Sequence, residues 1–272
     1  MTAVILVTFC LNTLAKSAAD FYESAVERFN QKDYQAAIIL LKNALRENPK
    51  HLPSRILLGQ SQLHAGDAIA AENDLKTALS SGADEEQVVV LLGSTYLIQG
   101  KYEQLLKEVR SGGRATAVET QILVLRANAY LHLGQTEQAE KTFVQARRLS
   151  PNEPGPILGL ATVEIQSGNL DSAEKLVEEA EKFGPDEAET WYGKGEIQRL
   201  RGQTDLALEN LNKSIDKDPQ HVRARLSRAA ILMRPRRRML PFCIGIPGAS
   251  LPKRRPAAAP IAFTGSPSAI RA

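Results

Sequence analysis

Histidine and cysteine are the residue types best suited to metal binding and nucleophilic catalysis, and this sequence has few of them. The cysteines are Cys10 and Cys243, near opposite ends of the chain. The four histidines are His51, His64, His132 and His221. None belongs to an HExxH motif, and none lies at zinc-site spacing from a cysteine. The pattern favours surface or groove histidines and predicts no metal site.

The motifs that hold phosphates or present a nucleophile are also missing. We find no GxxxxGK[ST], no GxGxxG and no GxSxG. Acidic residues are numerous, but many form Glu–Lys pairs at helical spacing, such as Glu137 and Lys141, which is typical of solvated helix faces. No two carboxylates stand out as an acid–base pair. The sequence therefore predicts a protein that is not an enzyme and has no cofactor.

Charge is distributed unevenly along the chain. The net charge is +3, but residues 234–272 contain eight Lys or Arg and no Asp or Glu. The preceding 233 residues are therefore mildly acidic, with 26 basic and 31 acidic residues. A nucleic-acid surface would need basic residues clustered on one face. We expect no nucleic-acid partner.

A period of 34 residues organises most of the chain. Glycines recur at this spacing, at Gly66, Gly100, Gly134, Gly168 and Gly202. Prolines and alanines do the same, at Pro151, Pro185 and Pro219 and at Ala139, Ala173 and Ala207. This register predicts six repeats, at 18–51, 52–85, 86–119, 120–153, 154–187 and 188–221. A further helix is expected from Val222 to Met233.

The residue sizes within each repeat predict a pair of antiparallel helices. The eighth and twentieth positions are usually Ala or Gly, which lets two helices approach closely, and a larger residue at the twenty-fourth position fills the space beside them. Gly at the fifteenth position ends the first helix, and Pro at the thirty-second ends the second. Each helix pair leaves one face uncovered, and the next pair covers it.

These motif residues resemble the tetratricopeptide repeat (TPR), whose period is also 34 residues. The fourth repeat carries the pattern most fully, in Leu123, Ala127, Tyr130, Gly134, Ala139, Phe143, Ala146 and Pro151. The resemblance spans residues 18–233 and implies an all-α, right-handed superhelical solenoid of stacked antiparallel helix pairs. Repeat three departs most, with Leu105 at a small-residue position and Gly112-Gly113 near its end. We expect a bend or a loosened second helix there.

The TPR resemblance also implies a binding surface. In such a solenoid the first helices line the concave side, mainly through positions two, five, nine, twelve and thirteen. The predicted groove residues are Ile56, Gln60, Leu63, His64, Val90, Ser94, Leu97, Val124, Asn128, Leu131, His132, Leu158, Thr162 and Ile165. Repeat six adds Tyr192, Glu196, Arg199 and Leu200. This aliphatic strip, polar at each ninth position, suits a helical or extended peptide with apolar anchors.

Two details limit what the groove can bind. His64 and His132 lie two repeats apart, which is too far for one metal ion. Some TPR co-chaperones hold a carboxylate with Lys at position five and Asn at position nine. Only Asn128 matches here, because position five of the same repeat is Val124. A co-chaperone role is therefore disfavoured.

The first residues suggest export. Residues 3–11 form an apolar run that is too short to span a bilayer but matches the core of a signal peptide, and Thr13-Leu14-Ala15 could be cleaved. No Lys or Arg precedes the run, and a hydrophobic helix packed on the first repeat is the alternative. Cys10 resembles a lipoprotein attachment cysteine, although Phe9 before it is bulky. We expect residues 1–17 to be a signal or anchor segment, with possible membrane association.

The last 39 residues break the repeat pattern. Residues 234–272 contain seven of the 14 prolines and no helical period, which predicts a disordered, basic tail. The Arg-rich start of this tail could dock on an anionic surface. A truncated or frame-shifted reading frame explains it better, because the seventh repeat lacks its second helix.

A narrower resemblance suggests a biological setting. The segments 33–45 and 70–79 resemble the opening repeats of the bacterial PEP-CTERM system TPR-repeat lipoproteins, whose members are longer. That family implies an exported, membrane-anchored protein linked to exosortase sorting and exopolysaccharide production. We therefore expect a scaffold that binds a protein or peptide partner in its concave groove at the bacterial cell envelope. A cytoplasmic adaptor, or a regulatory subunit of a glycan-synthesising complex, is the alternative.

Overall fold

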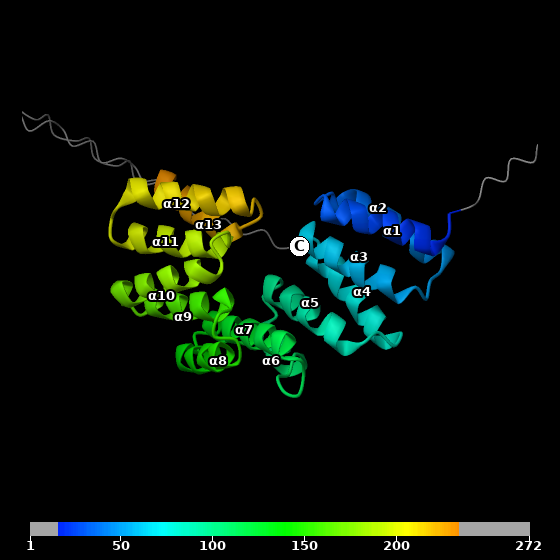
Figure 1. Cartoon of the computed structure of the whole chain (residues 1–272), viewed down its shortest axis with the longest axis horizontal. Helices are drawn as coiled ribbons and strands as arrows, with labels where there is room; N and C mark the ends of the chain where they lie inside the picture. The colour runs from blue at the N-terminus through cyan, green and yellow to red at the C-terminus, as the bar shows by residue number, and fades with distance from the viewer. Residues whose placement is uncertain (1–15, 234–272) are drawn as a thin grey trace, which may run out of the picture. The chain divides into compact units, whose positions relative to one another are not determined.

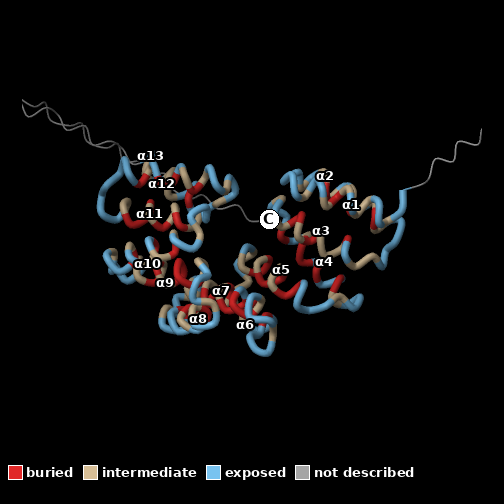
Figure 2. The backbone as a smooth tube through the Cα atoms, viewed as in Figure 1, coloured by how far each residue is buried: buried red, intermediate tan, exposed pale blue. Residues whose placement is uncertain are grey.

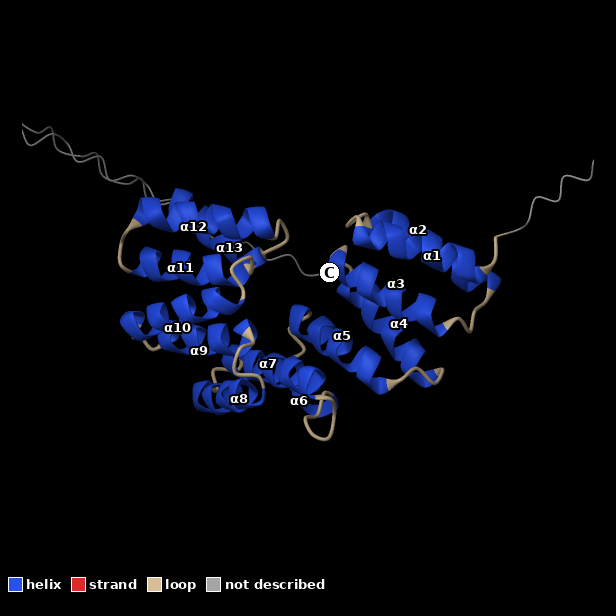
Figure 3. Cartoon of the chain, in the orientation of Figure 1, coloured by secondary structure: helices blue, strands red, loops and turns tan. Residues whose placement is uncertain are grey.

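The computed structural model describes residues 16–233, and all secondary structure in this part of the chain is α-helical (Figure 3). Seven helices are the first members of the predicted pairs: α1 (Ala18–Asn30), α3 (Leu52–His64), α5 (Glu85–Ile98), α7 (Thr116–His132), α9 (Pro154–Gln166), α11 (Ala188–Leu200) and α13 (Val222–Met233). Six are second members: α2 (Tyr34–Glu47), α4 (Ala68–Ser80), α6 (Tyr102–Glu108), α8 (Thr136–Leu149), α10 (Leu170–Phe183) and α12 (Thr204–Lys217). The predicted leader up to Ala15, including Cys10, and the predicted tail 234–272 lie outside the described residues.

Local sequence signals set where the helices begin and end. Helix α1 starts at a capping box, in which the Ser17 hydroxyl accepts from the Asp20 N–H and the Asp20 carboxylate accepts from the Ser17 N–H. The turn between α3 and α4 passes through Gly66 at φ +86°, a left-handed conformation that costs glycine little. The Asp67 carboxylate then accepts from the Ala70 N–H and caps α4. Each tight turn makes the two helices it joins antiparallel.

The helices stack in two rows (Figure 1). Each first helix contacts the first helix of the next repeat, from α1 and α3 through to α11 and α13. Successive second helices, such as α2 and α4, do not contact one another in the described part of the chain. The row of first helices is therefore the tightly packed, concave side of the stack. This confirms the predicted fold class, an all-α solenoid of stacked antiparallel helix pairs.

The core runs between the helices along the stack (Figure 2). The residues predicted to fill each pair at position twenty-four are all buried: Leu41, Leu75, Val109, Phe143, Val177 and Leu211. The small residues opposite them are required. A Cβ on Gly59 would lie 2.7 Å from Leu75, and one on Gly195 would lie 2.8 Å from Leu211. Burial of these aliphatic residues between neighbouring helices stabilises the solenoid.

Repeat three is loosened, as its sequence predicts. Helix α6 has 7 residues, whereas α4 has 13 and α8 has 14. Gly112 and Gly113 then adopt φ values of +127° and +80°, which take the chain out of the helix. One predicted boundary is wrong, because α7 begins at Thr116 and not at Thr120. Because α6 ends early, α7 starts about one turn before the residue that the 34-residue register predicts.

Candidate functional site

The predicted groove residues all lie on first helices, α3, α5, α7, α9 and α11, on the concave side of the stack. The structure gathers those of repeats four and five around one cavity of about 380 Å³ between α7, α9, α11 and α13. The predicted residues of repeats four and five that line it are Asn128, Leu131, His132, Leu158, Thr162 and Ile165. The four residues predicted in repeat six also line it: Tyr192, Glu196, Arg199 and Leu200. Val124 lines an adjoining cavity of about 270 Å³, which shares Asn128, Leu158 and Thr162 with the first.

The floor of the larger cavity is apolar. Leu131, Leu158 and Ile165 form it together with Ala161, and Val177 of α10 lies beneath Gly193 of α11. A Cβ on Gly193 would come 3.1 Å from the Val177 side chain. Because Gly193 has no side chain, the cavity reaches down to Val177. Such a recess can accept one apolar side chain of a partner.

Charged residues form one wall of this cavity, and the groove prediction for repeats four and five did not include them. Glu189 of α11 accepts from Arg223 Nη2 at 2.5 Å and lies 2.8 Å from His221 Nε2. The Arg223 guanidinium stacks 4.8 Å from the centre of the Tyr192 ring. Glu189 and Arg223 occupy the second position of repeats six and seven. The groove prediction left out the second position in repeat six and did not include repeat seven, so applying the full rule to both would have found them.

A second ion pair lies within α11 and lines the same cavity. Arg199 donates from Nε and Nη2 to the Glu196 carboxylate at distances of 2.8 to 3.1 Å. The pair follows i,i+3 spacing, so both side chains lie on one face of the helix. The Glu196 carboxylate is buried behind the Arg199 guanidinium. The two arginines, 199 and 223, thus face the cavity in front of their carboxylates.

The protonation of this wall follows from these contacts. Burial raises the pKa of Glu189, but the hydrogen bond from His221 and the charge of Arg223 outweigh burial and hold the pKa below its usual value. Burial raises the pKa of Tyr192, and the Glu196 charge adds to this effect. Near neutral pH Glu189 is therefore ionised and Tyr192 is a neutral phenol.

Two of the histidines, each in the last turn of a first helix, stack on the tyrosine that begins the second helix of the preceding repeat. The ring centres of Tyr102 and His132 lie 4.7 Å apart with the planes 2° from parallel. Tyr34 and His64 are 4.9 Å apart and 13° from parallel. Burial lowers the pKa of both histidines, and the positive charge of Arg223 also lowers that of His132. Both rings are therefore neutral at neutral pH, which fits a packing role.

The predicted groove residues of repeats two and three serve packing more than exposure. Ile56, Val90 and Leu97 are half-buried against the core of these repeats. Gln60, Leu63 and Ser94 are half-buried, and they line none of the cavities described above. Repeats two and three are therefore the part of the predicted aliphatic strip that packs between repeats. The open recess belongs to repeats four to seven.

Asn128, the residue that matches the co-chaperone clamp, has its amide donor engaged. Its Nδ2 donates to the Val124 carbonyl of the preceding turn at 3.0 Å. Within residues 16–233, the second N–H of this amide and the side-chain oxygen make no hydrogen bond, so both can face the cavity. The absence of the co-chaperone clamp stays a prediction from the sequence, which has Val124 at position five.

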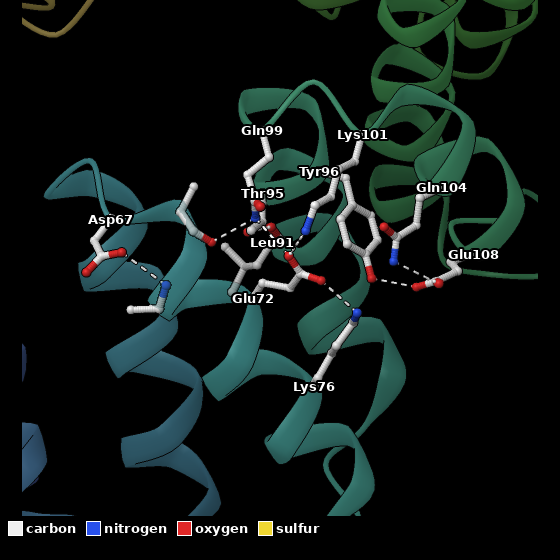
Figure 4. A network of polar contacts seen from close by, with 12 residues as sticks. Asp67, Glu72, Lys76, Leu91, Thr95, Tyr96, Gln99, Lys101, Gln104 and Glu108 are labelled. Carbon is white, nitrogen blue, oxygen red and sulfur yellow. Dashed lines mark hydrogen bonds and ion pairs between the residues drawn. The ribbon is translucent and has the colours of Figure 1, made fainter. Parts of the chain in front are cut away.

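A polar cluster joins α4 to α5 and the start of α6 (Figure 4). Glu72 accepts from Lys76 at 2.7 Å, from Lys101 at 2.6 Å and from Gln99 at 2.9 Å. Burial raises the pKa of Glu72, but these three donors outweigh burial and lower it to about 2. Because every donor comes from the protein itself, the cluster acts as a structural clip between repeats two and three.

A tyrosine extends this cluster. Tyr96 donates to Glu108 Oε2 at 2.5 Å, which ties α5 to the end of α6 (Figure 4). Burial and the Glu108 carboxylate raise the pKa of Tyr96 to about 12. The prediction that acidic residues lie on solvated faces is wrong for Glu72, Glu119 and Glu196, which are buried. Each accepts hydrogen bonds across a turn or a repeat boundary, and the 34-residue pattern does not reveal such pairs.

No group of three His, Cys, Asp or Glu side chains within residues 16–233 is placed to bind a metal ion. No helix in this range is both long enough and apolar enough to cross a bilayer.

Comparisons with known proteins agree with the fold. A family model for the tetratricopeptide repeat matches residues 28–93 and 130–197. No curated protein matches the sequence. Similar solved structures include that of the APC/C hetero-tetramer Cut9–Hcn1, with a TM-score of 0.59 and 14% identity over 79% of this chain and 43% of that one.

Two further solved proteins share this fold. PilF from Pseudomonas aeruginosa has a TM-score of 0.53 and 16% identity, over 78% of this chain and 97% of that one. PilW, described as a widely conserved type IV pilus biogenesis factor, has a TM-score of 0.54 and 15% identity, over 77% of this chain and 97% of that one. Likeness at these identities shows a shared fold.

Proposed function

We propose that this chain, which is built from tetratricopeptide repeats, is a scaffold that binds a protein partner in the groove along its first helices. The observation that carries this proposal is the 380 Å³ recess on the concave side, with an apolar floor and a charged wall. A recess of this kind takes an anchoring side chain, while the rest of the groove follows the peptide backbone. Its contribution to the cell is then assembly and not chemistry.

The proposal also places the protein at the bacterial cell envelope, in exopolysaccharide production or protein sorting. Support comes from the apolar run at residues 3–11, from Cys10 and from the resemblance of the opening repeats to PEP-CTERM system lipoproteins. The occurrence of the same fold in a type IV pilus biogenesis factor is compatible with this placement. Fractionation of cells that express the wild type or Cys10→Ser tests it. Loss of membrane association in the variant supports anchoring, and an unchanged cytoplasmic fraction favours the adaptor alternative.

The groove proposal can be tested with charged substitutions. Leu131→Asp and Ile165→Asp each place a carboxylate on the apolar floor and should abolish recovery of the partner by affinity purification from the native cells. Ile69→Asp is the matched control, because Ile69 is a 69% exposed aliphatic residue on the second helix α4. Circular dichroism of each variant confirms folding. If both groove variants keep every partner that the control keeps, the proposal is wrong.

A further inference from the structure

The two ion pairs of the recess present their positive members to the groove. Arg199 has 32% of its side chain exposed and its partner Glu196 has 9%. Arg223 has 46% exposed and its partner Glu189 has 29%. A ligand that approaches from the groove therefore meets guanidinium groups before carboxylates. The wall is neutral in total charge but offers hydrogen-bond donors on its accessible side.

These guanidiniums keep unused donors. A guanidinium has five N–H donors. Within the described residues, Arg199 uses only Nε and Nη2, both on Glu196. Arg223 uses only Nη2, on Glu189. The Nη1 groups of both arginines, and Nε of Arg223, are available to an incoming acceptor.

We propose that the recess between α7, α9, α11 and α13 selects a segment of the partner in which an apolar residue stands beside an Asp or Glu. The apolar side chain enters the recess above Gly193, and the neighbouring carboxylate accepts from Arg199 and Arg223. This inference rests on the proposed groove-binding function and specifies the chemistry of the partner. Arginine is well suited to such carboxylate contacts because its planar fork matches the two oxygens.

The adjoining cavity supplies the opposite preference and so fixes the position of the carboxylate. Glu189 and Arg223 line both cavities, whereas Arg199 lines the larger recess and not the adjoining one. The adjoining cavity has Glu153 and Glu187 instead, both exposed at the N-terminal ends of α9 and α11. An acidic residue bound there would be repelled. The carboxylate is therefore favoured in the larger recess, beside Arg199.

The apolar floor sets the other half of the preference. Leu131, Leu158 and Ile165 surround a volume of about 380 Å³ that Gly193 leaves open above Val177. A charged side chain placed there would be desolvated without a partner on the floor, which is costly. The recess thus discriminates between the two neighbouring residues of the segment, one apolar and one acidic.

A displayed library of random 12-residue peptides, selected on the full chain, tests this inference. We expect enriched peptides to contain an apolar residue next to Asp or Glu. For the best such peptide, changing the acidic residue to Asn or Gln should weaken binding about tenfold, the loss expected for a charge-assisted hydrogen bond. This comparison leaves the protein unaltered, so misfolding cannot explain its result. Arg223→Gln should weaken the original peptide to a similar extent and the amide peptide much less.

A second test of the inference fills the recess with a bulky side chain. Thr162→Trp should abolish binding of every enriched peptide, whereas Ile69→Trp on α4 should not affect it. Groove-dependent peptides that lack an acidic residue, or that lose nothing when Asp becomes Asn, overturn this inference and leave the proposed function intact. If no enriched peptide is lost on Leu131→Asp, the proposed function fails and the inference fails with it.

Discussion

Individual glycines determine how closely neighbouring repeats approach. In α9, a Cβ on Gly159 would lie 2.1 Å from Phe143 Cε1, which is far inside normal contact distance. Gly155 of the same helix has open space, because its nearest neighbour would be Val124 at 3.8 Å. Two glycines in one helix therefore differ in what they permit. Phe143 fills the core between repeats four and five only because Gly159 has no side chain.

Alanine substitutions at these two glycines should have opposite effects. Gly159→Ala should lower the free energy of unfolding by about 1–3 kcal/mol, because overpacking outweighs the helix propensity that alanine gains. Gly155→Ala should leave stability unchanged or raise it by up to about 1 kcal/mol. Urea unfolding followed by circular dichroism measures both. Equal stability of the two variants would show that the Phe143 side chain can move aside at no cost in free energy, which would contradict this prediction.

The sequence reveals only part of this residue-scale packing. The small residue at position eight and the large one at position twenty-four recur in every repeat, so the contacts of Gly59 and Gly195 could be predicted. The contact of Gly159 could not, because position six holds Leu in some repeats and Gly in others. The size of the residue that fits at position six depends on which residue occupies position twenty-four of the preceding repeat.

At the scale of elements, the clip around Glu72 holds α4 to α5 where repeat three is weakest. Lys76, Gln99 and Lys101 all donate to this one carboxylate. The two lysines are about two-fifths exposed, so solvent screens part of the attraction. The clip stabilises a junction at which α6 offers only 7 residues for packing.

Removing the Glu72 charge should therefore destabilise the protein in a pH-dependent way. The folded-state pKa of about 2 lies below the ordinary value of 4.5, so the stabilisation is present above pH 4.5 and is lost as pH falls toward 2. Glu72→Gln should cost about 1–3 kcal/mol at pH 7. Unfolding midpoints of wild type and variant should converge as pH falls below 4.5. Glu137→Gln breaks an exposed pair with Lys141 that solvent screens, so it should show a much smaller trend of the same sign. A constant difference at all pH values would contradict the role of this carboxylate.

The loop after α6 supports a second prediction about elements. Helix propensity alone would make Gly112→Ala with Gly113→Ala stabilising. Both residues have positive φ, where alanine is strained, so the double variant should instead lose about 1–3 kcal/mol. Urea unfolding decides between the two. A more stable variant would mean that α6 can extend and that its 7 residues are not required by the fold.

Element boundaries could be predicted from the sequence wherever the repeat motif is intact. Helices α1, α3, α9, α11 and α13 begin at the residues where the 34-residue register places them. Helix α7 begins four residues early, because Gly112-Gly113 shortens the helix before it. Periodicity gives the average repeat and carries no information on how a neighbour adjusts to a local defect.

At the scale of the whole stack, function depends on the two rows of helices. The first helices contact one another and the second helices do not, so the first row forms the concave side on which all predicted groove residues lie. The groove positions predicted from the sequence lie on this row, and their role in binding stays a prediction. The sequence could not show that the open recess lies in repeats four to seven, because in repeats two and three Ile56, Val90 and Leu97 pack into the core. Which repeats leave an open recess and which bury their groove residues depends on how each pair of neighbouring repeats is packed.

The central claim, that a partner occupies the groove between α7 and α13, can be tested most directly by site-specific photo-crosslinking. A benzoylphenylalanine residue placed at Leu131 or Thr162 reports contact on the concave side, and one placed at Ile69 on α4 is the control. In native cells, the groove positions should crosslink to the same partner and Ile69 should not. Crosslinking of that partner from Ile69 alone would show that the binding surface lies elsewhere.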